Sequence, residues 1–354
     1  LYDRGPAQPY EAAQTAADYD AAFSSANMGS ALIAGDLNGD QIDDIVLLIP
    51  PILAAPGAPD EDIPFSAGLF FGRPEGHSGV LNIADADVLL NGELPLPMVI
   101  DYPPTTAALG DVNGDGLDDL LLGDPSTDTG AGKAYVVLGR RDWPATLDLS
   151  AADWVLSVAG SNAFGNAVSA AGDVNGDGLA DLLVGAAGYT LARGAVWLYL
   201  GREQGAAPAR TTFHPPGLAP SPPAHLAGLG DTNGDGLSDF LIAFAGPVEA
   251  PSPVALVQGR PDDAWPPVDP VDLGYAAAAL FLGRGTQQTV SPAGDLDGDG
   301  LRDMLIGDPD ATEPYLYILF GRRPEDAWTP APDRHLLSDV ADASFVDPGT
   351  PCLL

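Results

Sequence analysis

Cysteine, lysine and histidine are scarce in this sequence. Cys352 is the only cysteine among 354 residues, so the chain cannot form an internal disulfide. Lysine occurs once, at Lys133, and the four histidines show no spacing typical of a zinc site. No Gly-x-Ser-x-Gly motif is present. The sequence therefore carries no signal of a disulfide-stabilised domain, a zinc site or a serine hydrolase, and we expect a protein that is not an enzyme.

Positive charge and long hydrophobic runs are also missing. The chain has 14 basic against 50 acidic residues, a formal net charge of −36. Such a surface repels nucleic acid and anionic membranes, which excludes both as expected partners. The best apolar run, residues 45–55, is broken by Pro50 and Pro51, so we expect no direct membrane insertion.

What the chain does contain is one nine-residue stretch that occurs five times. Its clearest copy runs from Asp173 to Asp181, with Asp or Asn at positions 1, 3, 5 and 9. Glycines stand where the backbone must turn sharply. Oxygen ligands at alternate positions suit a hard divalent cation, and calcium accepts six to eight oxygens in irregular geometry. The pattern therefore predicts a calcium loop, to which position 7 adds a backbone carbonyl.

These loops are not EF-hands, because an EF-hand carries a bidentate Glu at position 12. The residues at that position are aliphatic: Leu47, Leu122, Val184, Ile242 and Ile306. Each lies in a short apolar run typical of a buried strand. The loops should therefore join two β-strands. A set of Asp-Gly turns that bind no metal is the alternative, and five recurrences with every ligand position kept disfavour it.

We expect about five calcium ions, one in each loop. The predicted ligands are Asp36, Asn38, Asp40, Ile42 and Asp44; Asp111, Asn113, Asp115, Leu117 and Asp119; Asp173, Asn175, Asp177, Leu179 and Asp181; Asp231, Asn233, Asp235, Leu237 and Asp239; Asp295, Asp297, Asp299, Leu301 and Asp303. In the first loop Gln41 replaces the glycine at position 6. If that position needs a positive φ, the first loop should bind its ion least tightly.

The repeats predict the fold. Successive loops start 75, 62, 58 and 64 residues apart, a period that suits one multi-stranded unit. The third unit predicts strands at 167–172, 182–186 and 195–200, and a less clear fourth at 211–213. The third strand ends at Gly-Arg in every unit, most weakly at Gly259-Arg260. Four short strands per unit, repeated around an axis, describe an all-β fold, a β-propeller of five four-stranded blades.

Phe164-Gly165, the loop Asp173 to Asp181, and Gly185-Ala186-Ala187 resemble the FG-GAP repeat of integrin α-subunit propellers and of bacterial secreted FG-GAP proteins. The resemblance covers residues 23–347. It implies a calcium-stabilised, extracellular or cell-surface propeller, and it brings no activity with it. Phe-Gly is intact only in the third unit. Integrin propellers have seven blades, so the five here either close alone or form part of a six- or seven-bladed ring.

We divide the chain into an N-terminal extension (1–22), one propeller domain (23–347) and a C-terminal tail (348–354). The five units cover 23–91, 92–158, 159–213, 214–284 and 285–347. Residues 11–22 predict a weak helix. The outer strand of the last unit comes either from residues 343–346 or from the segment near Phe23, which would lock the termini together. We favour closure of this kind.

The expected function is a non-catalytic adhesion or scaffold module that binds a protein or glycan partner, or another copy of the chain. Recognition should fall on the proline-rich connectors 50–65 and 247–270. A carbohydrate-binding propeller is the alternative, because Trp143, Trp265 and Trp328 recur after the Gly-Arg stop and could stack on sugars. Their equivalent places favour an architectural role instead. A hydrolase or lyase is a third reading, and no motif supports it.

Overall fold

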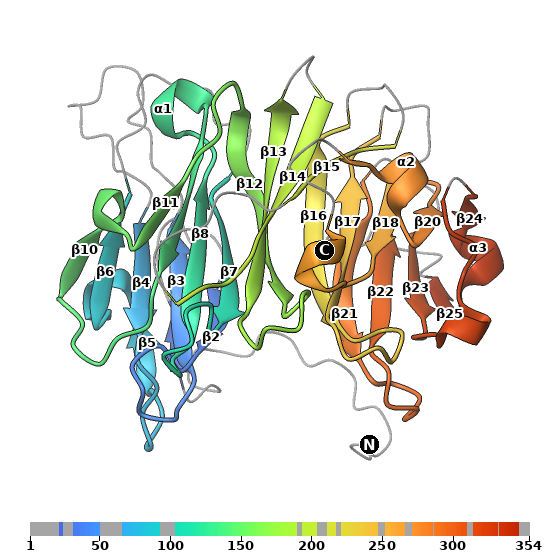
Figure 1. Ribbon diagram of the computed structural model, residues 1–354. Coiled ribbons are helices and arrows are strands. Elements are labelled where there is room, and N and C mark those ends of the chain that lie inside the picture. Colours follow the sequence, from blue (N-terminus) through green and yellow to red (C-terminus); the bar gives the residue numbers. More distant parts are fainter. Residues whose placement is uncertain are drawn as a thin grey trace.

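The computed structural model describes residues 21–23, 31–49, 66–92, 103–189, 193–203, 211–216, 221–246, 252–265, 271–285, 287–309, 314–331 and 333–346. The fold is all-β, with helices of only three or four residues (Figure 1). Within these ranges no helix is long and apolar enough to cross a bilayer. The predicted binding segment 50–65 lies outside the described residues, as do the two ends of the segment 247–270 (247–251 and 266–270) and Cys352. The middle of the second segment is described, and residues 253–257 form a strand there.

Five sheets form the body of the molecule, and their main strands are antiparallel with roughly aligned axes (Figure 1). Each has four main strands. The first sheet has β2 (Ala31–Gly35), β3 (Asp44–Ile49), β4 (Ser66–Phe70) and β6 (Val88–Asn91); the second has β7 (Thr105–Gly110), β8 (Asp119–Asp124), β9 (Lys133–Val137) and β11 (Trp154–Leu156); the third has β12 (Asn162–Gly172), β13 (Asp181–Tyr189), β14 (Arg193–Tyr199) and β15 (Thr211–His214); the fourth has β16 (Pro223–Gly230), β17 (Asp239–Phe244), β18 (Pro253–Val257) and β20 (Ala279–Leu282); the fifth has β21 (Thr289–Gly294), β22 (Asp303–Asp308), β23 (Tyr315–Leu319) and β25 (Ala343–Val346).

A connector leads from the third to the fourth strand of each sheet, and three of these connectors also pair with the preceding sheet. They do so through a short parallel strand: β10 (Thr146–Asp148) on β6, β19 (Val271–Asp272) on β15, and β24 (His335–Leu336) on β20. A one-turn helix follows each strand: η3 (Leu149–Ala151), α2 (Leu273–Ala276) and α3 (Leu337–Val340). The first leucine of each helix is fully or almost fully buried. Neighbouring sheets are thus joined along their outer edges as well as by packing.

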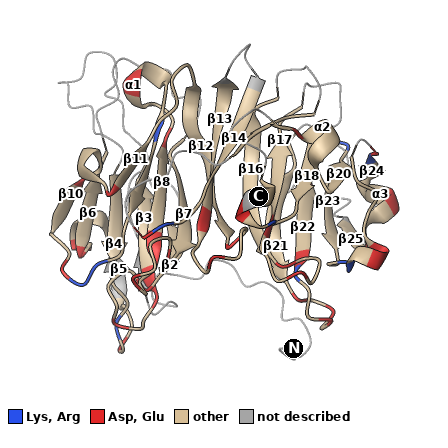
Figure 2. Cartoon of the chain, viewed as in Figure 1, with Lys and Arg blue, Asp and Glu red and all other residues tan. Residues whose placement is uncertain are grey.

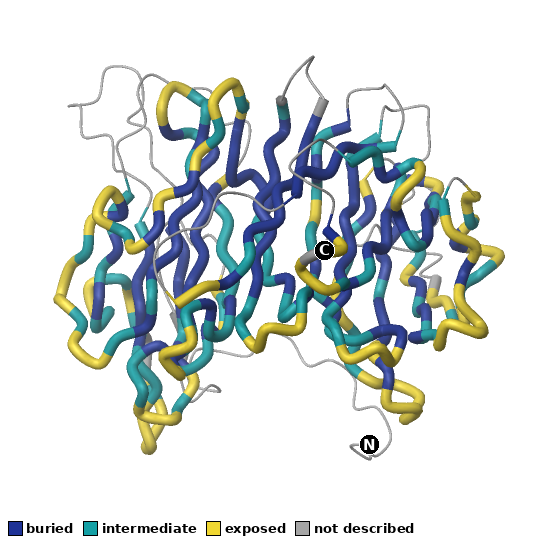
Figure 3. The backbone as a smooth tube through the Cα atoms, viewed as in Figure 1, coloured by how far each residue is buried: buried dark blue, intermediate teal, exposed yellow. Residues whose placement is uncertain are grey.

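The hydrophobic core lies between successive sheets. Alternate residues of each buried strand point to opposite faces, so one strand contributes to two layers. In β17, for example, Leu241 packs toward the fifth sheet and Ile242 toward the third. Four apolar layers result, between sheets one and two, two and three, three and four, and four and five. Figure 3 shows the central strands as the most continuously buried part of the chain.

The recurring Gly-Arg at the end of the third strand has a structural role. The arginine pairs with an aspartate at the start of the fourth strand in three sheets, as Arg73 with Asp87 at 3.0 Å and Arg322 with Asp342 at 3.2 Å. The same aspartate accepts a backbone N–H from the end of the third strand, at 2.9 Å from Phe71 in the first sheet. This arrangement fixes the turn into the connector.

Most expected strands are present, including the uncertain one at 211–213, which is β15. Two expectations are wrong. Ala21 and Ala22, the end of the predicted helix, lie in strand β1 (Ala21–Phe23). This strand does not complete the last sheet, because β25 already occupies the outer edge there. Instead β1 pairs in parallel with β5 (Gly79–Leu81), in the connector of the first sheet.

Two phenylalanines at equivalent outer-strand positions allow a direct test of this packing. Phe281 is fully buried against Trp328, whereas Phe345 is 61% exposed on the fifth sheet. We expect Phe281→Ala to lower the free energy of unfolding by about 3–5 kcal/mol. Phe345→Ala should change it by about 0.5 kcal/mol or less. Urea denaturation of both variants measures the difference, and equal losses would contradict the described layers.

Candidate functional site

The five nine-residue loops connect the first and second strands of the five sheets, as expected. All five emerge at the same end of the sheets, where Figure 2 shows acidic residues gathered on successive loops. This position follows from the repeat, because each sheet begins with an edge strand that runs toward that end. The candidate ligands are therefore grouped within each loop, and the loops form a row.

The third loop shows how the side chains are held. Both carboxylate oxygens of Asp173 turn inward: Oδ1 accepts the N–H of Gly176 at 2.6 Å, and Oδ2 accepts that of Gly178 at 2.8 Å. Asn175 Oδ1 accepts the N–H of Asp177 at 3.1 Å. Asp177 Oδ1 in turn accepts the N–H of Leu179 at 2.9 Å. The loop thus wraps around its own side-chain oxygens.

The other four loops repeat these contacts with small differences. In each, the position-1 carboxylate accepts the N–H groups of positions 4 and 6, at 2.6–3.0 Å. The position-5 carboxylate accepts the N–H of position 7 at 2.8–2.9 Å. The sequence pattern therefore specifies one geometry five times.

The glycines at positions 4 and 6 are required by this geometry. All five residues at position 4 have φ near +80°, and the four glycines at position 6 have φ of +83° to +89°. In the first loop Gln41 takes the same conformation, at +71°. A side chain there is strained, because the Cβ atom approaches the following carbonyl oxygen. The expectation that position 6 needs a positive φ is confirmed.

Position 9 differs from the others because its aspartate is fully buried. Each of the five carboxylates accepts two backbone N–H groups, one from position 2 of its loop and one from the glycine of the Gly-Arg stop. For Asp181 the donors are Val174 and Gly201, both at 2.8 Å. The equivalent aspartates are Asp44, Asp119, Asp239 and Asp303, with N–H distances of 2.6–3.0 Å. Position 9 therefore ties the loop to the end of the third strand.

Burial makes four of these carboxylates hold their protons more tightly. It raises the pKa of Asp119 and Asp181 to about 7, and that of Asp44 and Asp239 to about 6, although the two backbone N–H groups act in the opposite direction. The carboxylates at positions 1 and 5 of the same loop raise the pKa further by repulsion. A nearby cation would favour the charged form and oppose this shift.

The donor set of each loop suits a hard cation. It consists of carboxylate and amide oxygens only, with no sulfur or imidazole. In the fifth loop, carboxylate oxygens of Asp295, Asp297 and Asp303 lie within 4.8 Å of one another. The structure thus brings positions 1, 3 and 9 together as predicted there. For every predicted ligand, including the position-7 carbonyls, binding of an ion stays a prediction.

Sequence reasoning missed a second role of the loops, which is contact with the next sheet. The position-8 N–H of one loop donates to the position-1 carbonyl of the loop before it, at 2.8–3.1 Å in four successive pairs. The arginine N–H of the Gly-Arg stop in the second to fifth sheets donates to the position-2 carbonyl of the preceding loop, at 2.8–2.9 Å. Position 8 varies in residue type (Asp118, Ala180, Ser238, Arg302), so the sequence pattern could not reveal this backbone bond. In the second loop the side chain adds to it, because Asp118 Oδ2 accepts the N–H of Asp36 at 2.8 Å.

The three repeated tryptophans have an architectural position. Trp265 and Trp328 are 3% and 9% exposed, and Trp143 Nε1 donates to the Leu37 carbonyl of the first loop at 3.2 Å. In each case the arginine of the Gly-Arg stop lies over the indole, 4.6–5.1 Å from its centroid.

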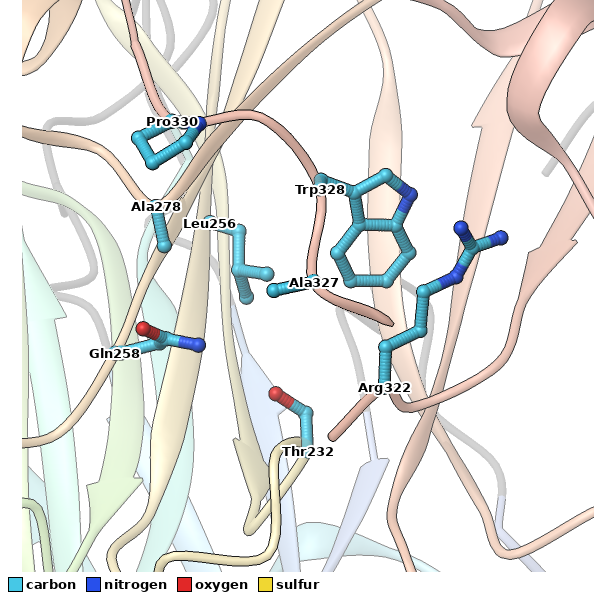
Figure 4. Close-up of a pocket in the computed structure, with 8 residues that line it drawn as sticks. All are labelled: Thr232, Leu256, Gln258, Ala278, Arg322, Ala327, Trp328 and Pro330. Carbon is cyan, nitrogen blue, oxygen red and sulfur yellow. The ribbon is translucent and has the colours of Figure 1, made fainter. Parts of the chain in front are cut away.

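Figure 4 shows Arg322 beside Trp328, next to a small cavity that is also lined by Leu256, Gln258 and Thr232. The arginine covers a face of the indole on which a sugar would stack. The tryptophans therefore pack the connectors, which favours the architectural reading over the sugar-binding one.

Comparison with known proteins agrees with this architecture. The family model described as FG-GAP repeat matches residues 103–137 and 164–199. Integrin alpha-PS5 of Drosophila melanogaster is 31% identical over 175 residues, 48% of this chain and 16% of that protein. Integrin alpha-4 of Xenopus laevis is 34% identical over 152 residues, 41% of this chain and 14% of that protein. The chain thus matches only a small part of these relatives' length.

Among solved structures, BBS1N in complex with ARL6DN has a TM-score of 0.37 at 11% identity, over 86% of this chain and 84% of that one. The exotype rhamnogalacturonan lyase YesX has a TM-score of 0.36 at 11% identity, over 86% of this chain and 67% of that one. Overlaps this loose carry no functional argument. The sequence matches carry more: FG-GAP repeats lie at residues 103–137 and 164–199, and part of the chain is similar to integrin α subunits.

Proposed function

We propose that the chain is a calcium-stabilised β-propeller that acts outside the cell, or on its surface, as a non-catalytic adhesion or scaffold module. The observation that carries the proposal is the fivefold repeat of one oxygen-lined loop, each ending in a buried carboxylate. The residues that would hold the ions are those at positions 1, 3, 5 and 9, with the position-7 carbonyl completing each set. The division into five units within 23–347 belongs to this proposal, with 1–22 and 348–354 as flanking segments.

Calcium would act here as a structural ion. Each loop brings at least three carboxylates together, and five loops lie on one end of a protein with a net charge of −36. A bound cation neutralises this repulsion and replaces the protons that the buried position-9 groups otherwise hold. The loops also hydrogen-bond to neighbouring sheets, so well-ordered loops would hold the five sheets in place. Since their oxygens face inward, recognition would fall to other surfaces.

Similarity to integrin α subunits supports an interaction role, and the described residues offer no motif for chemistry. Glycan binding is the second candidate, and it would have to use surfaces other than the buried tryptophans. No residue of the chain is proposed as a catalytic group of a lyase or hydrolase.

Removal of metal tests the structural role. We expect a chelator to lower the melting temperature substantially and calcium to restore it, because the ion binds the folded loops far better than the unfolded chain. Differential scanning calorimetry in chelator, calcium and magnesium measures the effect. A melting temperature that does not change in excess chelator would rule out structural calcium.

A pair of reciprocal substitutions tests the first loop. Gln41→Gly should stabilise the protein by about 1 kcal/mol, because it removes a side chain from a positive-φ position. Gly178→Gln is the matched control: a Cβ atom at Gly178 meets no atom within 4 Å, so only backbone strain should destabilise it. In calcium titrations Gln41→Gly should also increase the affinity of the weakest site. If both variants melt like the parent, the position-6 argument fails.

Calcium should weaken the dependence of stability on pH. The four position-9 carboxyls with pKa of about 6–7 have an ordinary value of 3.8, so the metal-free folded state binds protons more tightly than the unfolded chain. Their contribution to stability is present below pH 4 and is lost as the pH rises to 7. Metal-free protein should therefore melt higher at pH 5 than at pH 8. Net negative charge acts in the same direction, so the decisive measurement is the gain on adding calcium, which should be larger at pH 8.

The interaction role is tested on cells that produce the protein. We expect surface cross-linking followed by mass spectrometry to capture a protein partner in calcium and to lose it in chelator. A glycan array probed with the calcium-loaded protein tests the second candidate function, glycan binding. Specific glycan binding without any cross-linked protein would overturn the proposal in favour of a lectin.

A further inference from the structure

The first and the fifth sheet each have one face that lacks, among the described residues, the sheet-to-sheet contact seen between neighbouring sheets. In four successive pairs, one sheet buries its face against the next, and its loop carbonyls accept backbone N–H groups from that next sheet. The fifth sheet has no such successor and the first no such predecessor among the described residues. Both free ends nevertheless retain the features that make the contact elsewhere.

The outward face of the fifth sheet is apolar and exposed. Leu296, at loop position 2, is 53% exposed, whereas its four equivalents Leu37, Val112, Val174 and Thr232 are at most 1% exposed. Phe345 is 61% exposed, against 5% or less for Leu90, Leu156, Phe213 and Phe281. Leu316 pairs with Phe345 across the strands and is 36% exposed, while its equivalents are fully buried. These residues form what we call the open face.

Backbone groups show the same difference. The loop carbonyls of positions 1 and 2 accept N–H groups from the next sheet in the first four loops, but those of Asp295 and Leu296 have no such bond in the described part of the chain. At the other end, the N–H groups of Asp43 and Arg73 stand where Asp118 and Arg140 donate in the second sheet. Within the same described ranges, neither has the corresponding partner. The unpaired carbonyls and the unpaired amides are the two halves of one repeated contact.

Strand β1 identifies what fits between them. In three sheets the connector strand of one sheet pairs in parallel with the fourth strand of the sheet before it. The connector strand of the first sheet is β5, and its partner is β1. Phe23 lies 8 residues before β2; the corresponding spacings are 6 residues from Leu156 to β12, 9 from His214 to β16, 7 from Leu282 to β21 and a longer 14 from Asn91 to β7. By pairing and by chain spacing, β1 is the fourth strand of a sheet that precedes the first.

We propose that at least one further sheet of the same FG-GAP construction completes this row. It takes β1 as its own fourth strand, and its loop carbonyls accept the N–H groups of Asp43 and Arg73. It belongs to a ring in which another sheet contact covers the open face. The occupant is a three-stranded repeat unit that ends in an edge open to β1. A second copy of this chain fits less well, because all five of its sheets already have their fourth strands. This inference stands independently of the proposed calcium and adhesion roles.

Two extended variants test each end separately. In the first, a second copy of residues 162–210, which carries β12, β13 and β14, replaces residues 1–20 directly before Ala21. In the second, a copy of residues 159–214 follows Val346. Both are measured in calcium beside the parent chain. The first should slow hydrogen exchange several-fold at the amides of Asp43 and Arg73, and the second should lower hydroxyl-radical labelling of Phe345 and Leu316 several-fold.

The controls decide the occupant. The second variant carrying Phe345→Asp should lose the protection of Leu316, since a charge would be buried in the new layer. In the parent, Phe345 should be labelled much more than Phe281 at every protein concentration. Protection in the dilute monomer would mean that the chain closes on itself, and protection that grows with dimer mass would assign the face to a second copy. Either result overturns the proposal. The proposal also fails if the added unit folds without protecting these residues, or if the added unit itself stays unprotected.

Discussion

A fully buried aspartate at position 9 of each loop accepts one N–H from the loop and another from the end of the third strand. This contact places a negative charge inside the protein, where burial opposes ionisation. It also fixes the Gly-Arg turn, from which the arginine reaches both the connector and the preceding loop. The packing of one sheet on the next therefore depends on a carboxylate that is best stabilised by a cation beside it. In the proposed calcium-bound protein, this residue would link structure and ion binding more directly than the exposed residues of the loop.

Short-range chemistry explains why so much could be predicted from the sequence. The loop pattern specifies its own hydrogen bonds, since donors and acceptors lie within five residues of one another. Its positive-φ positions follow from glycine, and the aliphatic run after each loop must be a buried strand. The role of Arg322 over Trp328 is also local, within one connector. Repetition then supplied the number of units, because each copy independently predicts the same strands.

Contacts between units could not be predicted in the same way. The position-8 bonds use backbone atoms at a residue that varies freely, so no side chain marks them. The partner of β1 was misjudged for a related reason. A three-residue strand such as Ala21–Phe23 has little side-chain pattern, and the choice between the first connector and the last sheet is made by backbone pairing alone. The pairing of β1 is therefore set by which sheets lie next to each other, and not by a sequence preference within the strand.

Exposed apolar area on the fifth sheet adds a constraint that any account of function must meet. A sheet face that carries Leu296, Leu316 and Phe345 resembles the inside of the other layers more than a solvated surface. Net charge discourages random association, because both partners of a self-contact would be strongly acidic. A unit built on the same repeat meets the face with matching shape and matching backbone groups, and each further loop would bring its own cation. The contacts that hold the sheets together thus also define which kind of unit can pack against the row.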